Sequence, residues 1–250
     1  MPSDPRTGTC GYCGTAGEVT RDHIFARSFF PPPLPNDPYM VDACRECQEK
    51  KAKDETPFRD FLVMADTAAS LSSEAEALRP KVRRALSRNR SPQLAELRDK
   101  GIMKPVVGRD GKSLGRALHV PADSVPINEA IAWMVRGLIG NVASRPLPDT
   151  FDIIVNRYYP YEFAELRQFM SEFPFYGPCR VGDAIRFWYV GDSQDEFSSL
   201  WVLGFYDRAM FSTMVAPRSQ LEPASSSQSS VCTSTLSTLG KCSPINRGRR

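Results

Sequence analysis

Four cysteines near the N-terminus are the residues of this sequence whose spacing most directly specifies a chemistry. They form two Cys-x-x-Cys pairs, Cys10/Cys13 and Cys44/Cys47. Each pair can fold as a tight turn that presents two sulfurs to one point, so the two pairs can surround one tetrahedral zinc ion. Separate buried thiols or redox pairs are the other interpretation, and the doubled motif favours zinc. Four thiolate ligands leave no open position, so the predicted ion is structural and does no chemistry itself.

An acidic residue and a histidine lie side by side between the two cysteine pairs. Asp22 and His23 fall in a segment, residues 18–24, that we expect to be extended, and Gln48 and Lys51 follow the second pair. Adjacent residues of a strand face opposite ways, so both side chains reach one site only if the strand bends or ends there. The other interpretation is that Asp22 caps or pairs locally and that His23 fills the zinc element.

These residues together resemble the motif of the HNH endonucleases, in which Asp-His-Ile lies between two Cys-x-x-Cys pairs and an amide or imidazole residue follows the second pair. The site of that family is a ββα-metal element, here in the version with an added structural zinc. The resemblance implies that His23 is the general base that activates a water for attack on a phosphodiester. It implies that Asp22 and Gln48 bind a catalytic divalent cation, such as Mg²⁺ or Mn²⁺. Lys51 takes the lysine position of the motif.

Two positions differ from the usual pattern of that family. Tyr39 stands about five residues before the second pair, where the family usually has asparagine, and Asn36 is the nearest amide. Gln48 stands where most members have histidine or asparagine. These differences favour an alternative function, a zinc-dependent nucleic-acid-binding protein without cleavage activity. A zinc-supported protein-interaction domain is a third candidate.

The activity implied by the resemblance is hydrolysis of phosphodiester bonds in DNA, with RNA as the other possible substrate. His23 would take the proton of the attacking water. A cation held by Asp22 and Gln48 would stabilise the departing 3′ oxygen. Lys51 by preference, or Arg27, would stabilise the charge that develops on the phosphate.

Local basic segments must supply any affinity for nucleic acid, because the net charge of the whole chain is only +3. Lysines near the start of an expected helix at residues 47–65 would hold the phosphate backbone, aided by the helix dipole. The segment 79–90 carries six basic residues and no acidic one. It is either a phosphate-contacting stripe or a solvated helix face. The candidates for nucleic-acid binding are Arg27, Lys50, Lys53, Arg79, Arg83 and Arg84.

Length and composition predict a soluble globular protein. The chain has 250 residues, of which 41% are hydrophobic and 24% charged. The sequence contains no signal peptide and no run of about 18 apolar residues. We therefore expect a cytoplasmic protein that has no membrane partner, and the four paired cysteines fit a reducing compartment. The oligomeric state is not specified by the sequence.

The predicted fold class is α+β. It consists of an N-terminal zinc-stabilised ββα-metal (HNH) element at 8–65, a helical connector with a hairpin at 66–125, a C-terminal half at 126–216 and a disordered tail at 217–250. The C-terminal half is expected to pack a helix, residues 127–143, on an antiparallel sheet with a second hydrophobic core. The order of these elements also resembles a bacterial HNH branch. Pro80 and Pro92 are expected to interrupt the connector helix, and His119 is expected to be structural.

Overall fold

The protein is α+β, as predicted, in a computed structural model that describes residues 5–64, 72–88, 102–107, 113–119, 125–158 and 162–221. The described strands form three sheets, with the orders β1-β2-β3, β4-β5 and β6-β10-β9-β8-β7. No helix within these ranges is long and apolar enough to cross a membrane.

The N-terminal element is a small antiparallel sheet followed by a long helix. Its elements are β1 (Arg6–Thr9), β2 (Ala16–His23), the short 3-10 helix η1 (Arg27–Phe29), β3 (Met40–Ala43) and α1 (Arg45–Met64). Strand β2 pairs with both β1 and β3 and ends at His23. The proline-rich segment between η1 and β3 is a loop, as its composition predicts.

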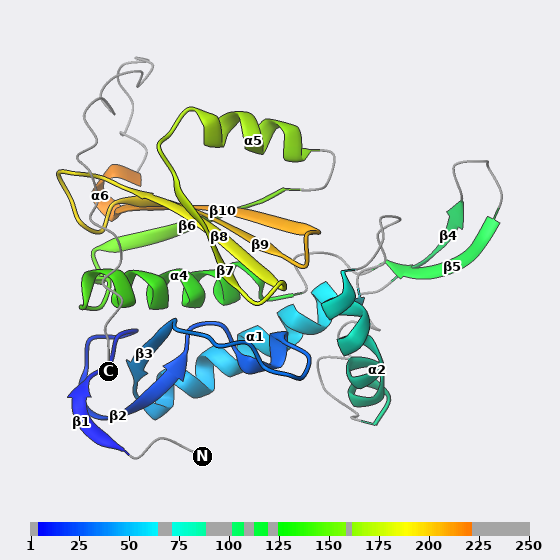
Figure 1. Cartoon of the computed structure of the whole chain (residues 1–250), viewed down its shortest axis with the longest axis horizontal. Helices are drawn as coiled ribbons and strands as arrows, with labels where there is room; N and C mark the ends of the chain where they lie inside the picture. Colours follow the sequence, from blue (N-terminus) through cyan, green and yellow to red (C-terminus); the bar gives the residue numbers. More distant parts are fainter. Residues whose placement is uncertain are drawn as a thin grey trace.

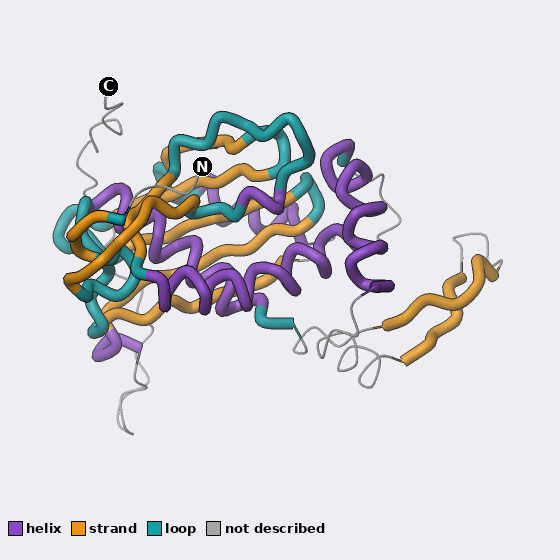
Figure 2. Tube along the Cα trace, turned by 90° about the horizontal axis from the view of Figure 1, so that it is seen from below, coloured by secondary structure: helices purple, strands orange, loops and turns teal. Residues whose placement is uncertain are grey.

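The connector contains a helix and a hairpin. Helix α2 (Ser73–Arg88) is continuous through Pro80, so the predicted break at this residue is wrong. Proline removes one backbone hydrogen bond, and the helix is held nonetheless by its buried face of Ala75, Leu78 and Val82. Strands β4 (Ile102–Val107) and β5 (Ser113–His119) form the expected hairpin, which projects from the body of the protein (Figures 1 and 2). Pro92 and the hairpin turn lie outside the described residues.

The C-terminal half is a five-stranded antiparallel sheet between two helices. Helix α4 (Ile127–Ala143) lies between this sheet and the N-terminal element, and α5 (Phe163–Ser171) covers the opposite face (Figure 1). The strands are β6 (Phe151–Tyr158), β7 (Tyr176–Val181), β8 (Ile185–Gly191), β9 (Ser199–Phe205) and β10 (Ala209–Pro217). Strand β7 was not predicted because it contains Pro178, which an edge strand tolerates.

The described part of the chain extends slightly beyond the predicted start of the tail. Strand β10 ends at Pro217 and is followed by a short helix, α6 (Arg218–Leu221). The remainder of the predicted tail, residues 222–250, lies outside the described part of the chain.

The N-terminal element and the C-terminal sheet share one hydrophobic core, where the sequence suggested two. Phe58 of α1 is fully buried at their junction, and its ring centroid lies 5.3 Å from that of Phe205 and 5.6 Å from that of Phe211. The ring centroid of Phe29 of η1 lies 6.1 Å from that of Phe58 and 5.9 Å from that of Phe205. Helix α1 is therefore held in place by the C-terminal sheet.

We expect Phe58→Ala to destabilise the protein by about 3–5 kcal/mol, because truncation leaves a cavity between rings that cannot easily collapse. Urea denaturation followed by circular dichroism measures this change. Leu34→Ala is the control, since Leu34 is a large apolar residue that is 41% exposed. Equal midpoints for both variants would contradict a shared core at this position.

Candidate functional site

The four paired cysteines meet at one point of the structure. The sulfurs of Cys10, Cys13, Cys44 and Cys47 all lie within 4.8 Å of one another. Cys13 and Cys44, one residue from each pair, have Sγ atoms 3.9 Å apart. Four sulfurs at about 2.3 Å from a tetrahedral zinc would be roughly 3.8 Å apart. The cluster is therefore consistent with a structural Zn²⁺ site.

Local backbone structure holds the two pairs against each other. The first pair lies in a turn closed by the amide of Gly14, which donates to the carbonyl of Cys10 at 2.8 Å. Gly14 has a φ of +74°, which a side chain would strain. The amide of Gly11 donates to the carbonyl of Asp42 in β3 at 2.7 Å, which ties this turn to the strand that precedes the second pair. Gly11 is not in the left-handed region. It is needed for space instead, because a Cβ there would lie 2.0 Å from Cγ2 of Val41.

Burial and hydrogen bonds change the pKa values of the cluster cysteines in different directions. Burial raises the pKa of the Cys10 and Cys47 thiols. Burial also acts to raise the pKa of Cys13, but hydrogen bonds from Thr15 and neighbouring thiols outweigh it and lower that pKa to about 7. Four thiolates this close together repel one another unless a cation neutralises them. A zinc ion bound at this point would supply that neutralising charge.

His23 ends β2 and is held by a carboxylate from the following loop. Its Nδ1 lies 3.1 Å from Oδ2 of Asp37. The Asp37 side chain is only 4% exposed, and its Oδ1 accepts the backbone amide of Tyr39 at 2.9 Å. Burial raises the pKa of Asp37, whereas the Tyr39 amide and the histidine act in the opposite direction. A carboxylate acceptor at Nδ1 leaves Nε2 as the basic nitrogen, and the His23 side chain is 28% exposed.

Asp37 is the residue of this site that sequence reasoning missed. It lies in the proline-rich segment between η1 and β3, whose composition predicts only a loop. Tyr39, the residue at the usual asparagine position of the HNH pattern, packs instead against Phe25 and Phe187, with ring centroids 6.4 and 5.0 Å away. The only available signal was an acidic residue 14 positions after the histidine. Such a separation has no meaning until the loop is folded.

Asp22 faces the other side of the sheet, toward helix α1. Its Oδ2 accepts the hydroxyl of Tyr12 at 3.0 Å and lies 3.3 Å from Nζ of Lys51. Lys51 Nζ also donates to the backbone carbonyl of His23 and to Oε2 of Glu55, both at 2.9 Å. The Lys51 side chain is 3% exposed. It therefore cannot reach a phosphate on the surface, contrary to the role in charge stabilisation that the sequence suggested.

Burial and charge act in opposite directions on the pKa values of Lys51 and Glu55. Burial by itself lowers the pKa of Lys51, but the charges of Glu55 and Asp22 outweigh it and hold that pKa above its ordinary value. Burial raises the pKa of Glu55 to about 7 even though Lys51 opposes the shift. Within the described chain, Oε1 of Glu55 is buried without a hydrogen-bond partner. The arrangement is tightly packed and serves to position β2 on α1.

Gln48 lies on the same face of the sheet as Asp22. Its Nε2 donates to Oγ1 of Thr20 at 2.7 Å and to the carbonyl of Ala43 at 2.9 Å. Thr20 precedes Asp22 by two residues, so Gln48 and Asp22 are neighbours along one side of β2. His23, by alternation, faces the opposite side.

The oxygen atoms of this site fit a hard divalent cation by their chemistry. Asp22 offers a carboxylate and Gln48 an amide carbonyl, both of which suit Mg²⁺ or Mn²⁺. The Lys51 ammonium already neutralises one oxygen of Asp22, which works against such a cation. The structure brings Asp22 and Gln48 to one face, and it does not place His23 in hydrogen-bonding contact with either side chain among the interactions described.

The residues predicted to bind nucleic acid lie in three separate places. Lys50 and Lys53 are exposed on α1, with Lys50 in an ion pair with Glu46, and Arg27 is exposed at the start of η1. Arg79, Arg83 and Arg84 lie on α2 beside the C-terminal end of α1, where Nε of Arg79 donates to the carbonyl of Val63 at 3.4 Å. Sixteen helical residues separate Cys47 from Val63, which is about 24 Å. Helix α2 is thus distant from the start of α1, where the second cysteine pair lies, and sits beside the opposite end of that helix (Figure 1).

No family model matches this sequence, and comparisons with curated proteins and with solved structures likewise give no match. The likeness to HNH endonucleases therefore depends on the motif residues themselves. What the structure adds is the clustering of the cysteines and the environment of each neighbouring polar side chain.

We expect the purified protein to contain about one zinc ion per chain and the Cys44→Ser variant to lose most of it, because three thiolates hold the ion less tightly than four. Metal analysis by mass spectrometry measures the content. Cys179→Ser is the matched control, since Cys179 is a half-buried thiol outside the cluster. Zinc that is absent from the wild type, or unchanged in Cys44→Ser, would contradict the assignment.

We expect Lys51→Met to destabilise the protein by about 3–5 kcal/mol, since it leaves two carboxylates without their buried cation. Chemical denaturation at neutral pH gives the change in free energy of unfolding. Lys50→Met, one residue earlier but exposed, should leave the denaturation midpoint unchanged. If both variants behaved alike, the buried position of Lys51 would be wrong.

Proposed function

We propose that this protein is a metal-dependent DNA endonuclease of HNH type that hydrolyses phosphodiester bonds. The observation that carries the proposal is the His23–Asp37 pair, in which a buried carboxylate lies 3.1 Å from Nδ1 of a partly exposed histidine, in an N-terminal element that also holds the four-cysteine cluster. A histidine with one nitrogen fixed and the other open to solvent is suited to act as a general base.

In the proposed reaction, Nε2 of His23 takes a proton from a water molecule that attacks the phosphorus atom. Asp37 holds the imidazole in the tautomer that this step needs and stabilises the imidazolium that results. Asp22 and Gln48 are the residues that would hold the divalent cation. When bound, such an ion would stabilise the departing 3′ oxygen. Because Lys51 is buried, Arg27 is the remaining candidate for stabilising charge on the phosphate.

A second candidate function is zinc-dependent binding of nucleic acid without cleavage. It is favoured by the Lys51 ammonium, 3.3 Å from Oδ2 of Asp22, which occupies part of the coordination that a cation would need. It is also favoured by Gln48, whose amide is tied to Thr20 and Ala43. In this case the His23–Asp37 pair would serve to fix the loop between η1 and β3.

A plasmid-nicking assay with Mg²⁺ or Mn²⁺ separates the two functions. We expect the wild type to nick DNA and His23→Ala to lose at least about 100-fold in rate, the usual contribution of a general base. Asp37→Asn should lower kcat by up to about 100-fold with little change in KM, because it disturbs the orientation of the base and not the binding of DNA.

Zinc content and a gel shift on DNA without added divalent cation serve as controls for both variants. Each should match the wild type, which shows that the protein is folded and still binds. A wild-type protein that binds DNA but nicks none with either metal would refute the endonuclease and leave the binding function.

A further inference from the structure

Strand β7 forms one edge of the five-stranded sheet and lies beside the loop that carries Asp37. The turn after β7 packs on this loop, because a Cβ added at Gly182 would lie 3.4 Å from Cβ of Pro35. Within the strand itself, Cys179 accepts a hydrogen bond from the hydroxyl of Tyr39. The backbone amide of Tyr39 in turn donates to Asp37 at 2.9 Å. Strand β7 is therefore anchored to the loop that holds the proposed general base.

Tyr176, the first residue of β7, is the exposed end of a row of three aromatic rings. Cross-strand register places it next to Tyr189 of β8, and places Tyr189 next to Trp201 of β9. The ring centroids of Tyr176 and Tyr189 are 5.3 Å apart, and those of Tyr189 and Trp201 are 4.9 Å apart. Tyr189 and Trp201 are buried, whereas Tyr176 is 45% exposed. A ring supported in this way needs little further ordering to bind another flat ring.

The row of rings lies on the sheet face that is turned toward the N-terminal element. Phe187 precedes Tyr189 by two residues and therefore shares its face of β8. The ring centroid of Phe187 lies 5.8 Å from that of Phe25 and 5.0 Å from that of Tyr39. Aromatic side chains thus continue from the core between the two halves of the protein out to the β7 edge.

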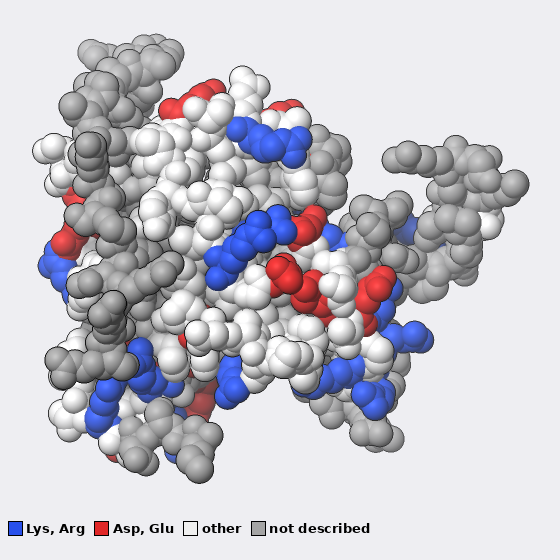
Figure 3. All heavy atoms as spheres, in the orientation of Figure 1, with Lys and Arg blue, Asp and Glu red and all other residues white. Residues whose placement is uncertain are grey.

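Positive charge is also found along this edge. Arg180 is exposed on β7, between Tyr176 and the turn that packs on the loop of Asp37. Figure 3 shows basic side chains grouped over the sheet near this edge. The edge thus combines an open aromatic ring with a cation that can bind a phosphate.

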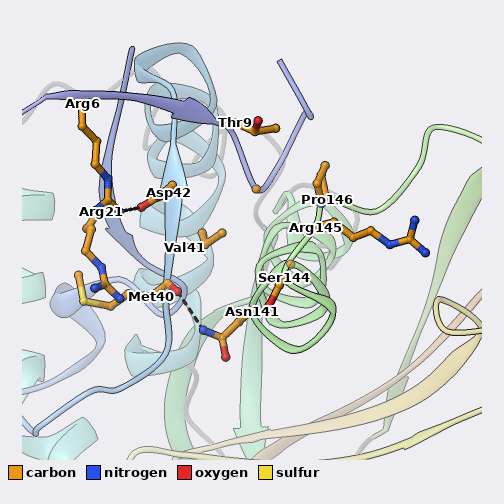
Figure 4. Close-up of a pocket in the computed structure, with 12 residues that line it drawn as sticks. Arg6, Thr9, Arg21, Met40, Val41, Asp42, Asn141, Ser144, Arg145 and Pro146 are labelled. Carbon is orange, nitrogen blue, oxygen red and sulfur yellow. Dashed lines mark hydrogen bonds and ion pairs between the residues drawn. The ribbon is translucent and has the colours of Figure 1, made fainter. Parts of the chain in front are cut away.

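The hollow between the N-terminal sheet and α4 differs from this edge, because several of its polar side chains are already engaged. Arg6 forms an ion pair with Asp42 there (Figure 4). Nδ2 of Asn141 donates to the carbonyl of Met40 at 3.0 Å. These groups are committed within the protein, whereas nearly half of Tyr176 is open to solvent.

We propose that Tyr176 stacks on an unpaired base of the nucleic-acid strand that enters the site at His23. The inference rests on the proposed function and deepens it, because it names the substrate class, DNA with an unpaired nucleotide near the cleaved bond. A base inside a duplex is covered by its neighbours on both sides. A ring on a sheet edge can therefore stack only on a base that is single-stranded or extruded. Arg180 binds the phosphate backbone of the same strand.

The test measures binding of a fluorescent single-stranded oligonucleotide by anisotropy, without added divalent cation. The wild type should bind the single strand more tightly than the duplex of the same sequence. Tyr176→Ala should weaken single-strand binding by about 10-fold, and Tyr176→Phe, which keeps the ring, should bind as the wild type does. Ile154→Ala is the matched control, since Ile154 is 37% exposed on the opposite face of the same sheet. Its binding should equal that of the wild type.

A scan with one abasic nucleotide separates stacking from a structural effect of the tyrosine. The oligonucleotide is no longer than the binding site, so that it cannot shift to avoid the missing base. In the wild type, the abasic nucleotide should cost about 10-fold in affinity at the position that faces Tyr176. In Tyr176→Ala the same change should cost nothing further, because the partner ring is already absent.

Single-strand binding that Tyr176→Ala leaves unchanged, or an abasic penalty that persists in full in this variant, would overturn the inference. So would a wild type that prefers the duplex or binds no nucleic acid. The proposed function fails separately: single-strand binding that depends on Tyr176, in a protein that cleaves no DNA, supports the stacking and refutes the nuclease. Cleavage with a KM that Tyr176→Ala does not change supports the nuclease and refutes the stacking.

Discussion

The buried ammonium of Lys51 is the interaction on which the geometry of the site depends. Removing an ammonium from water costs several kcal/mol, and the cost is offset only when its hydrogen bonds are satisfied inside the protein. Here three oxygens do so, and two of them belong to the last two residues of β2, Asp22 and His23. The third, from Glu55, comes from α1 itself. The Lys51 ammonium therefore fixes the end of β2 relative to the helix. It binds the backbone carbonyl of His23, while Asp37 of the loop holds the imidazole ring of the same residue.

Helix α1 joins this polar arrangement to the hydrophobic core through a single face. Gln48, Lys51, Glu55, Phe58 and Leu62 recur every three or four residues, so they form one stripe along the helix. The first part of the stripe is polar and contacts β2, and the second part is apolar and contacts the C-terminal sheet. An element of some fifty residues is too small to bury enough apolar surface alone. The cysteine cluster supports its beginning, and the phenylalanines of the shared core support the rest.

Sequence reasoning found the parts of this structure that short spacings encode. The paired cysteines, the extended segment around Asp22 and His23 and helix α4 follow from local pattern, because a tight turn, strand alternation and a helical period each act over a few residues. The buried position of Lys51 was also encoded, since it precedes Phe58 by seven residues on one helix face. It was missed because a lysine near a helix N-terminus in a nuclease-like motif invites a role in phosphate binding.

The remaining features depend on contacts between distant segments. Asp37 becomes a partner of His23 only when a loop rich in proline folds back to the strand end, and Arg6 meets Asp42 across 36 residues. Helix α2 continues through Pro80 because its apolar face is buried, a gain that no local rule for proline includes. Strand β7 is accommodated at an edge, which sequence cannot identify before the strand order is known.

The charge balance around Asp22 bears directly on the choice between cleavage and binding. At 3.3 Å, with an effective dielectric constant of about 20, an ammonium and a carboxylate attract by roughly 5 kcal/mol. A dication approaching Asp22 must overcome the repulsion of that same ammonium. Lys51, however, is shared by two carboxylates, so the group of Asp22, Lys51 and Glu55 carries a net charge of −1 when both acids are ionised. Because the pKa of Glu55 is raised to about 7, the net charge of the group lies between 0 and −1 at neutral pH. The buried lysine therefore weakens the proposed metal site, and most strongly at low pH, where Glu55 is protonated.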